Sequence, residues 1–410
     1  MAQRHLDPTD PTAAAGPPPV PAGGDALADY LRAQATEFLR ALRLHRESGA
    51  GAHGNGAHPS GAHPSGAGAL DRGRGRGPVP APDGPVDAAR ALRRAARRLS
   101  GTLHTFQPLL DAEWAEAMRP ELAWLSGTLA LEHAYASRLD RLLQALHRLS
   151  GSAAFPAQQA GRAAPARAAA TADPAPVAPL VPSVTRPSPA DRGNLTVGAA
   201  KAGALLDRQL TLARTRAHST ALQALGSSRF HAVADKVALL ASEVPLKDTA
   251  AAAADLRPLA AAARDRLTDA VAALPLVTAG NPYNAQALVH GLSPDPAPHP
   301  QDAQWHQVRL LLRLHRYALE VLAGTDADGA DGADGADGTT DVRLLAAGEA
   351  LDRHRDASEA AAAAAQAART PRIAPATAYA LGVLHADQRH EVEAARYAFQ
   401  HSWRKEPIRL

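Results

Sequence analysis

The chain has 410 residues, and its 44 Lys and Arg side chains exceed its 41 Asp and Glu side chains by only three. It contains no Cys, which excludes disulfide scaffolds, thiolate metal sites and thiol nucleophiles and suits a reducing compartment. Ala (99 residues), Leu and Arg are strong helix formers, whereas aromatic residues make up only 4% of the chain. The composition therefore predicts an all-α protein.

Low-complexity segments divide the chain into helical blocks. In chain order these segments are a disordered tail (1–24), a Gly/His/Pro insertion (48–85), a Pro/Ala linker (150–193), a Pro-rich connection (275–303), an Asp/Gly loop (324–340) and a C-terminal tail (405–410). The predicted helical segments are 25–47, 86–149, 194–274, 304–323, 341–369 and 374–404. The linker at 150–193 is the predicted boundary between two helical bundles, 25–149 and 194–404.

Two local signals refine the first bundle. Asp25 is a good N-cap, and apolar residues follow it at three- and four-residue steps, namely Leu27, Tyr30, Leu31, Phe38, Leu42 and roughly Leu39. In the second helical segment we expect a turn near Pro108 and a helix break near Pro120, because proline cannot donate a backbone hydrogen bond.

The segment Ala89–Phe106 carries an unusual row of cations, here called the first stripe. The members of the stripe are Arg90, Arg93, Arg94, Arg97 and Arg98. Helical spacing places them on one face of the helix and Leu92 and Leu99 on another. Repulsion between like charges one turn apart indicates either a polyanionic partner or acidic residues elsewhere in the fold. A solvated face in an Arg-rich chain is an equally good explanation of this segment alone. Among polyanions the guanidinium fork suits phosphate best.

A second stripe repeats this spacing about two hundred residues later. Its members are His306, Arg309, Arg313 and Arg316. The shared pattern [H/R]-x-x-R-x-x-x-R, once in each half, suggests a duplicated bundle whose two stripes face each other across one basic groove.

Other motifs give weaker signals. The insertion histidines His53, His58 and His63 lie in a Gly/Pro context without acidic neighbours, and the Asp/Gly loop lacks the spacing of a calcium-binding loop. No Glu-x-x-His pair, phosphate-binding loop or nucleophile elbow occurs. We therefore expect no catalytic residues, metal site or cofactor.

The stripes and the residues after them resemble the CHAD family of helical domains with conserved histidines. The first half matches in Arg90–Leu99, in Thr105-Phe106-Gln107-Pro108-Leu109-Leu110 and in Trp124-Leu125-Ser126-Gly127-Thr128-Leu129. The second half matches the family pattern H-x-x-R-x-x-x-K-R-x-R-Y-A-x-E and the later L-G-x-H-x-D in His306, Arg309, Arg313, Arg316, Tyr317, Ala318, Glu320, Leu351, His354 and Asp356. The opening helix and Ser228-Arg229-Phe230 also resemble the family, so the likeness covers most of residues 25–404.

The resemblance implies two antiparallel four-helix-type bundles related by a pseudo-twofold axis, with a basic surface between them that binds inorganic polyphosphate. The residues expected to bind polyphosphate are Arg90, Arg93, Arg97, Arg98, His306, Arg309, Arg313, Arg316 and His354. For His354 the alternative is a packed or capping role. The sequence departs from the family at Arg90, which replaces a histidine, at His133–Ala136, which lacks the family's R-D-x-D, at Leu314 and at Asp352. These departures imply a divergent member.

Our main hypothesis is thus a non-catalytic polyphosphate-binding protein. We expect it to be cytoplasmic, since residues 1–24 lack the apolar core of a signal peptide and no apolar run is long enough for a membrane span, and to associate with polyphosphate granules. The alternatives are a metal-dependent polyphosphate or triphosphate hydrolase, a nucleic-acid-binding module and a helical scaffold that binds no anion. The scarcity of aromatic side chains for base stacking argues against nucleic acid, and the sequence indicates no oligomeric state.

Overall fold

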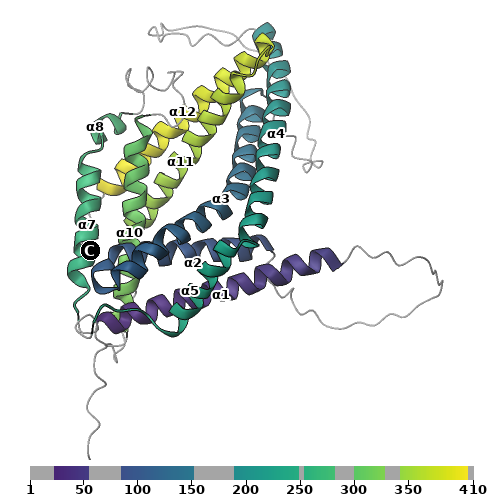
Figure 1. The fold of residues 1–410 in the computed structure, drawn as a ribbon. Coiled ribbons are helices and arrows are strands. Elements are labelled where there is room, and N and C mark those ends of the chain that lie inside the picture. Colours follow the sequence, from purple (N-terminus) through teal and green to yellow (C-terminus); the bar gives the residue numbers. More distant parts are fainter. Residues whose placement is uncertain are drawn as a thin grey trace, which may run out of the picture. The chain divides into compact units, whose positions relative to one another are not determined.

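The computed structural model of the chain describes residues 23–54, 85–151, 189–248, 254–281, 300–327 and 342–404. Within these ranges the chain is helical apart from short connections and one isolated β-bridge between Leu110 and Leu246, which confirms the all-α class (Figure 1). The predicted linker at 150–193 lies largely outside the described residues, as do His58, His63 and most of the Asp/Gly loop.

The helices follow the predicted blocks closely. Their bounds are α1 (Gly23–Gly54), α2 (Pro85–Thr105), the 3-10 turn η1 (Gln107–Leu109), α3 (Ala112–Leu149), α4 (Pro189–Leu225), α5 (Ser228–Ser242), α7 (Arg257–Ala272), α8 (Leu276–Ala279), α10 (Asp302–Ala327), α11 (Val342–Ala368) and α12 (Pro375–Arg404). The turn expected near Pro108 is confirmed as η1. Helix α1 continues past residue 47, because no proline stops it there.

The predicted break at Pro120 is wrong. Helix α3 runs without interruption through this residue. Pro120 leaves one backbone hydrogen bond unmade, but it is exposed, so water can reach the carbonyl that loses its partner. Met118, Leu122 and Leu125 bury their side chains on either side of it, and this apolar burial holds the helix straight enough to continue.

The chain forms two compact units. The first unit contains Met1–Leu129, Gln223–Asp269 and Leu310–Asp341, and the second contains Ala130–Leu222, Ala270–Arg309 and Val342–Leu410. Each unit therefore combines segments from both sides of the linker. Helices α3, α4, α7 and α10 each contribute residues to both units.

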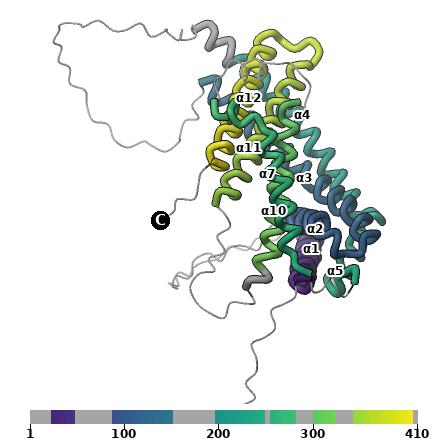
Figure 2. The backbone as a smooth tube through the Cα atoms, turned by 90° about the vertical axis from the view of Figure 1, so that its left-hand side faces the viewer, coloured from purple at the N-terminus to yellow at the C-terminus, as the bar shows by residue number. Residues whose placement is uncertain are grey.

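The core of the first unit is built on α1, α2 and α5, which lie side by side (Figures 1 and 2). The predicted apolar row of α1 is confirmed, since Leu27, Leu31 and Phe38 have no solvent-exposed surface. Burying each such side chain contributes roughly 1.5–3 kcal/mol, which explains why a three- and four-residue apolar spacing dictates how these helices pack.

Arg229 fixes α5 against α3 in the first unit. The Ser227 hydroxyl accepts the backbone N–H of Phe230 and caps α5, which directs Phe230 into the core. The Arg229 guanidinium then donates two hydrogen bonds to Glu121 and lies 4.0 Å from the centre of the Trp124 ring. The Ser-Arg-Phe motif of the sequence is thus a packing element.

The second unit is held by an alanine-rich seam. Helices α11 and α12 run alongside each other (Figure 2), and Ala360, Ala364 and Ala380 bury their methyl groups in the same cluster as Leu381 and Leu384. Small side chains let helix axes approach closely, so this seam gains many dispersion contacts although each residue is small. The Ala-rich composition therefore has a structural use here.

Two helical glycines of the first unit predict opposite effects of the same substitution. A Cβ atom on Gly101 of α2 would lie 2.6 Å from Cδ2 of Tyr317, whereas one on Gly127 of α3 would meet nothing within 4 Å. We expect Gly127→Ala to stabilise the protein by about 0.5–1 kcal/mol through helix propensity. Gly101→Ala should instead destabilise it, because overpacking costs about 1–3 kcal/mol. Urea unfolding of both variants measures this difference, and equal stabilisation by the two would contradict the close packing at Gly101.

Candidate functional site

Helix α2 presents the first stripe beside a buried apolar face. Leu92, Leu99 and Leu103 are fully buried. On the other side Arg90 and Arg94 are exposed, and Arg93, Arg97 and Arg98 are half-exposed. The helical spacing thus places the guanidiniums away from the core, as the sequence predicted.

Arg98 is held by an acidic partner from α10. Its Nε donates to Oε2 of Glu320 at 2.8 Å, and its guanidinium lies 5.9 Å from the centre of the Tyr317 ring. The Tyr30 hydroxyl of α1 donates to the same Glu320 oxygen at 2.8 Å. Burial, together with Glu320, raises the pKa of Tyr30, so its hydroxyl stays a proton donor. This junction joins three helices and neutralises Arg98.

Helices α2 and α10 pack against each other in antiparallel orientation within the first unit. Arg98 meets Glu320, and three residues later Gly101 lies against Tyr317 and Leu314. The part of α10 that bears Arg313 is therefore beside the C-terminal half of α2. Arg313 and Arg316 are half-exposed. The first unit thus contains the first stripe and two members of the second, on two helices that are in contact.

The other members of the second stripe belong to the second unit. Arg309 forms an ion pair with Asp352 of α11, a position where the family resemblance led us to expect glycine. His306 is half-buried and lies edge-on to His354, with ring centres 5.5 Å apart. Burial lowers the pKa of His306, which keeps its imidazole neutral at neutral pH.

His354 lies in the interior of the second unit, with only 1% of its surface exposed. Its ring stacks on Trp305 at 5.5 Å between centres, and its Nε2 accepts a hydrogen bond from Arg396 at 3.3 Å. Burial lowers the pKa of His354 to about 4, so the ring is neutral and the accepting nitrogen carries no proton. The structure thus places this predicted binding residue in a packed position.

The polar centre beneath His354 is Asp302, which is fully buried at the start of α10. Its carboxylate accepts hydrogen bonds from Arg389 (2.7 Å) and Arg396 (2.6 Å) of α12 and from the Ser358 hydroxyl of α11. Burial alone would raise the pKa of Asp302, but hydrogen bonds and the charge of Arg389 hold it well below its usual range.

This buried network was not predicted from the sequence. Asp302 reads as an ordinary first-turn acid that complements the helix dipole, and Arg389 and Arg396 are only two of many arginines. Their seven-residue spacing places them on one face of α12, which is the one signal that could have linked them. The network fixes the first turns of α10, on which His306 and Arg309 lie.

Within the described residues no group of three or more His, Asp or Glu side chains is arranged to hold a metal ion. In the same part of the chain no helix combines the length and the hydropathy that a bilayer crossing requires.

Residues 79–332 match the family model of the CHAD domain. The chain belongs to the CHAD family. The solved structure of PptA from Streptomyces chartreusis is 62% identical to this CHAD protein, with a TM-score of 0.66, and the alignment covers 94% of this chain and 100% of PptA. No curated protein matches the sequence. The family membership confirms the resemblance seen in the stripes.

Several motif residues of this CHAD protein serve its packing. Phe106 and Leu110 of the Thr-Phe-x-Pro-Leu-Leu run are buried in the first core, and Ala318 of the second motif packs into the same cluster. Glu320 closes the three-helix junction with Arg98. The cations on α2 and α10 are thus carried by a scaffold that the rest of the motif builds.

Because His354 is buried and neutral, we expect the stability of this CHAD protein to depend on pH. In the unfolded chain a histidine takes up a proton near pH 6.5, but in the folded protein only near pH 4. As pH falls through this window the unfolded state binds more protons, so the free energy of unfolding decreases by about 3 kcal/mol from this group. Urea unfolding at pH 7, 5.5 and 4.5 should show this loss in wild type and a flatter dependence in His354→Gln.

The exposed His390 of α12 provides the matched control. His390→Gln should keep the pH dependence of wild type between pH 7 and 4.5. If His354→Gln and His390→Gln gave the same curve, the stability effect could not be assigned to the buried ring.

Proposed function

We propose that this CHAD protein binds inorganic polyphosphate without catalysing a reaction, through cationic side chains of α2 and α10. The observation that carries the proposal is the gathering of arginines in the first unit, on two helices in direct contact, in a chain whose net charge is only +3. The residues that we assign to the ligand in this unit are Arg90, Arg93, Arg94, Arg97, Arg313 and Arg316. Membership in the CHAD family supports the assignment.

The geometry of guanidinium suits this ligand. Each arginine offers a planar fork of N–H donors that matches two oxygens of one phosphoryl group. A row of such forks at helical spacing meets a linear polymer with a negative charge on every unit. Binding of this kind releases condensed counterions, so it weakens steeply as salt is added.

Arg98 has a different role in this proposal. Its charge is compensated by Glu320, and its contact with Tyr317 belongs to the packing of α2 on α10. Because this side chain joins α2 to α10, we assign it a positioning role. His354 is omitted from the binding set because it is buried.

His306 and Arg309, which the sequence also predicts to bind the ligand, lie in the second unit. Arg309 retains its charge beside Asp352, and His306 presents a neutral imidazole that can donate one hydrogen bond to a phosphoryl oxygen. A groove that combines both units stays a prediction of the repeated spacing.

Replacing four arginines of α2 and α10 tests the proposal. In the variant Arg93→Ala/Arg97→Ala/Arg313→Ala/Arg316→Ala we expect the affinity for long-chain polyphosphate to fall roughly 100-fold or more at low salt, since each charge-assisted hydrogen bond is lost. The slope of log affinity against log salt should become shallower by about 3, at about 0.7 per phosphate contact of a single strand. Mobility shift over a salt series measures both quantities.

The control removes the same charge elsewhere. Arg208, Arg216, Arg257 and Arg264 are exposed on α4 and α7, and their replacement by Ala lowers the net charge by the same four units. This variant should bind almost as wild type does. Equal losses in both variants would mean that net charge, and not the position of the arginines, decides binding. Release of orthophosphate in the presence of Mg²⁺ would instead favour the hydrolase alternative.

Removing the negative charge of Glu320 should increase the affinity for polyphosphate. Glu320→Gln keeps a partner for the Tyr30 hydroxyl but removes the negative charge that compensates Arg98. Polyphosphate affinity should rise by a few-fold to about tenfold, because a compensating charge beside the stripe is gone. Glu37→Gln on α1 makes the same charge change beside Arg40 and should have little effect. A loss of affinity in Glu320→Gln, with folding intact, would show that Arg98 itself must stay ordered to bind.

A further inference from the structure

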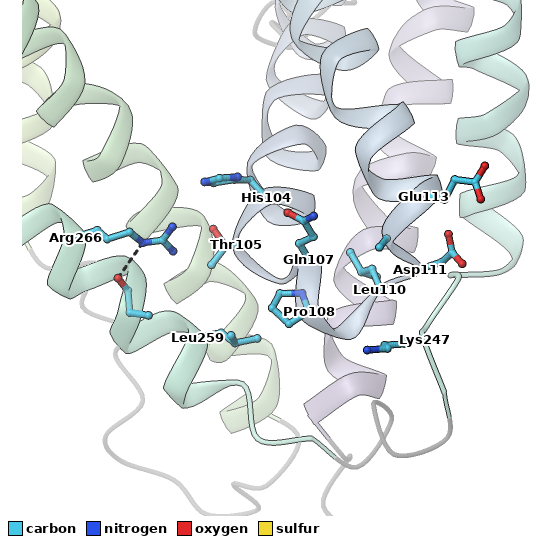
Figure 3. Close-up of a pocket in the computed structure, with 12 residues that line it drawn as sticks. His104, Thr105, Gln107, Pro108, Leu110, Asp111, Glu113, Lys247, Leu259 and Arg266 are labelled. Atoms are coloured by element: carbon cyan, nitrogen blue, oxygen red, sulfur yellow. Dashed lines mark hydrogen bonds between the residues drawn. The ribbon is translucent and has the colours of Figure 1, made fainter.

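A cavity of about 630 Å³ lies in the first unit, at the C-terminal end of α2 (Figure 3). Its walls come from the end of α2, from η1, from the start of α3, from Lys247 after α5 and from α7. The bridge between Leu110 and Leu246 fixes one side, and the Lys247 N–H donates to the Leu109 carbonyl at 3.0 Å. The volume is in the range of pockets that hold small molecules.

Three nitrogen-bearing side chains of this cavity have no acidic partner among the described residues. Arg266 makes one side-chain hydrogen bond within the described ranges, from Nε to the Ala262 carbonyl at 3.1 Å, which leaves its terminal nitrogens available. The Lys247 ammonium forms no ion pair in the part of the chain that the structure describes. Nδ1 of His104 is buried without a hydrogen-bond partner among the described residues.

Two arginines lie close enough to His104 to affect its imidazole. Burial, and then the charges of Arg119 and Arg266, lower the pKa of His104. Pro108 and Leu259 form apolar parts of the wall, while Lys247 and Arg266 are exposed to solvent at its edge.

The two acids of the cavity lie apart from Arg266 and His104. In Figure 3 the carboxylates of Asp111 and Glu113 are on the opposite side of η1 from these two residues. Asp111 is occupied in capping α3, because its Oδ1 accepts the N–H of Trp114 at 2.7 Å. Among the described residues that line the pocket, the side with Arg266 and His104 therefore carries no carboxylate, and Lys247 lies on the other side of η1 (Figure 3).

His104 also continues the first stripe. It follows Arg93 and Arg97 by eleven and seven residues, which places it within about 20° of both around the axis of α2. The rise from Arg97 to His104 is about 10 Å. A phosphate chain that follows the arginines of α2 would thus reach the cavity at the end of the helix.

We propose that this cavity is a binding site for a short run of phosphoryl groups, held by Lys247, Arg266 and His104. The occupant is either the end of a long polyphosphate chain or a free short polyphosphate, which share this chemistry. Binding of the end of a long chain rests on the function proposed above, whereas binding of a free short polyphosphate does not. The residues differ from those predicted for polyphosphate binding from the sequence.

Tripolyphosphate is the probe that tests the site. Isothermal titration should show binding to the full-length wild-type protein and a loss of at least tenfold in affinity in Lys247→Ala/Arg266→Ala. The matched control is Lys236→Ala/Arg264→Ala, which removes the same two charge types from α5 and α7 outside the cavity and should bind as wild type does. Thermal unfolding of each variant confirms that it is folded. Absence of tripolyphosphate binding to wild type, or equal affinities of the two variants, would overturn the proposal.

Two further measurements distinguish the end of a long chain from a free short polyphosphate, and the cavity proposal from the proposed function. If the end of a long chain enters the cavity, Lys247→Ala/Arg266→Ala also weakens long-chain polyphosphate; if only short polyphosphates enter, long-chain affinity is unchanged. Arg93→Ala/Arg97→Ala should keep tripolyphosphate binding. Retained tripolyphosphate binding together with no long-chain binding in wild type would support the cavity and refute the proposed function of the stripes.

Discussion

The close packing of α2 on α10 is the constraint on which the proposed site depends. A glycine at position 101 lets the aromatic ring of Tyr317 lie where any side chain would collide with it. One turn earlier Glu320 links Arg98 to Tyr30 and so joins three helices. The antiparallel register that follows places Arg313 and Arg316 beside the C-terminal half of α2. Without this contact the arginines that we assign to the ligand in the first unit would lie on two helices that do not meet.

The charge of the protein is organised by position. Many arginines are compensated by acids on neighbouring helices, as Arg229 is by Glu121 and Arg148 is by Asp387. The 41 acidic residues supply the partners for such pairs and bring the net charge of a chain with 44 basic residues to +3. Exposed pairs of this kind contribute little to stability, but they remove positive potential from the surfaces that carry them. On α2 Arg90 likewise pairs with Asp87, so the proposed site is distinguished by the spacing of its arginines along α2 and α10.

Periodicity made part of this predictable from the sequence. The apolar row of α1 and the five arginines of α2 follow from helical spacing alone, and the structure buries Leu27 and Leu92 and leaves Arg94 exposed accordingly. Contacts between distant segments were not predictable in this way. Pro120 reads as a helix break because the core that holds α3 together comes from other helices. Asp302 reads as a first-turn acid, although Arg389 and Arg396, 87 and 94 residues later, complete its network.

The same limit applies to individual site residues. His354 fits a family motif, and only its packing against Trp305 shows that its role is in the interior. Arg309 carries the spacing of the second stripe, but its partner Asp352 lies on another helix. Lys247 and Arg266 belong to no periodic pattern, and the cavity that unites them exists only once η1 and α7 have packed.

The central claim is that the arginines of α2 and α10 contact the ligand while other exposed arginines do not. Modification by phenylglyoxal, followed by mass spectrometry with and without long-chain polyphosphate, tests it residue by residue. We expect polyphosphate to protect Arg93, Arg97, Arg313 and Arg316 at low salt and high salt to remove this protection. Arg208 and Arg216 should react equally with and without polyphosphate. Equal protection of all exposed arginines, or none on α2 and α10, would contradict it.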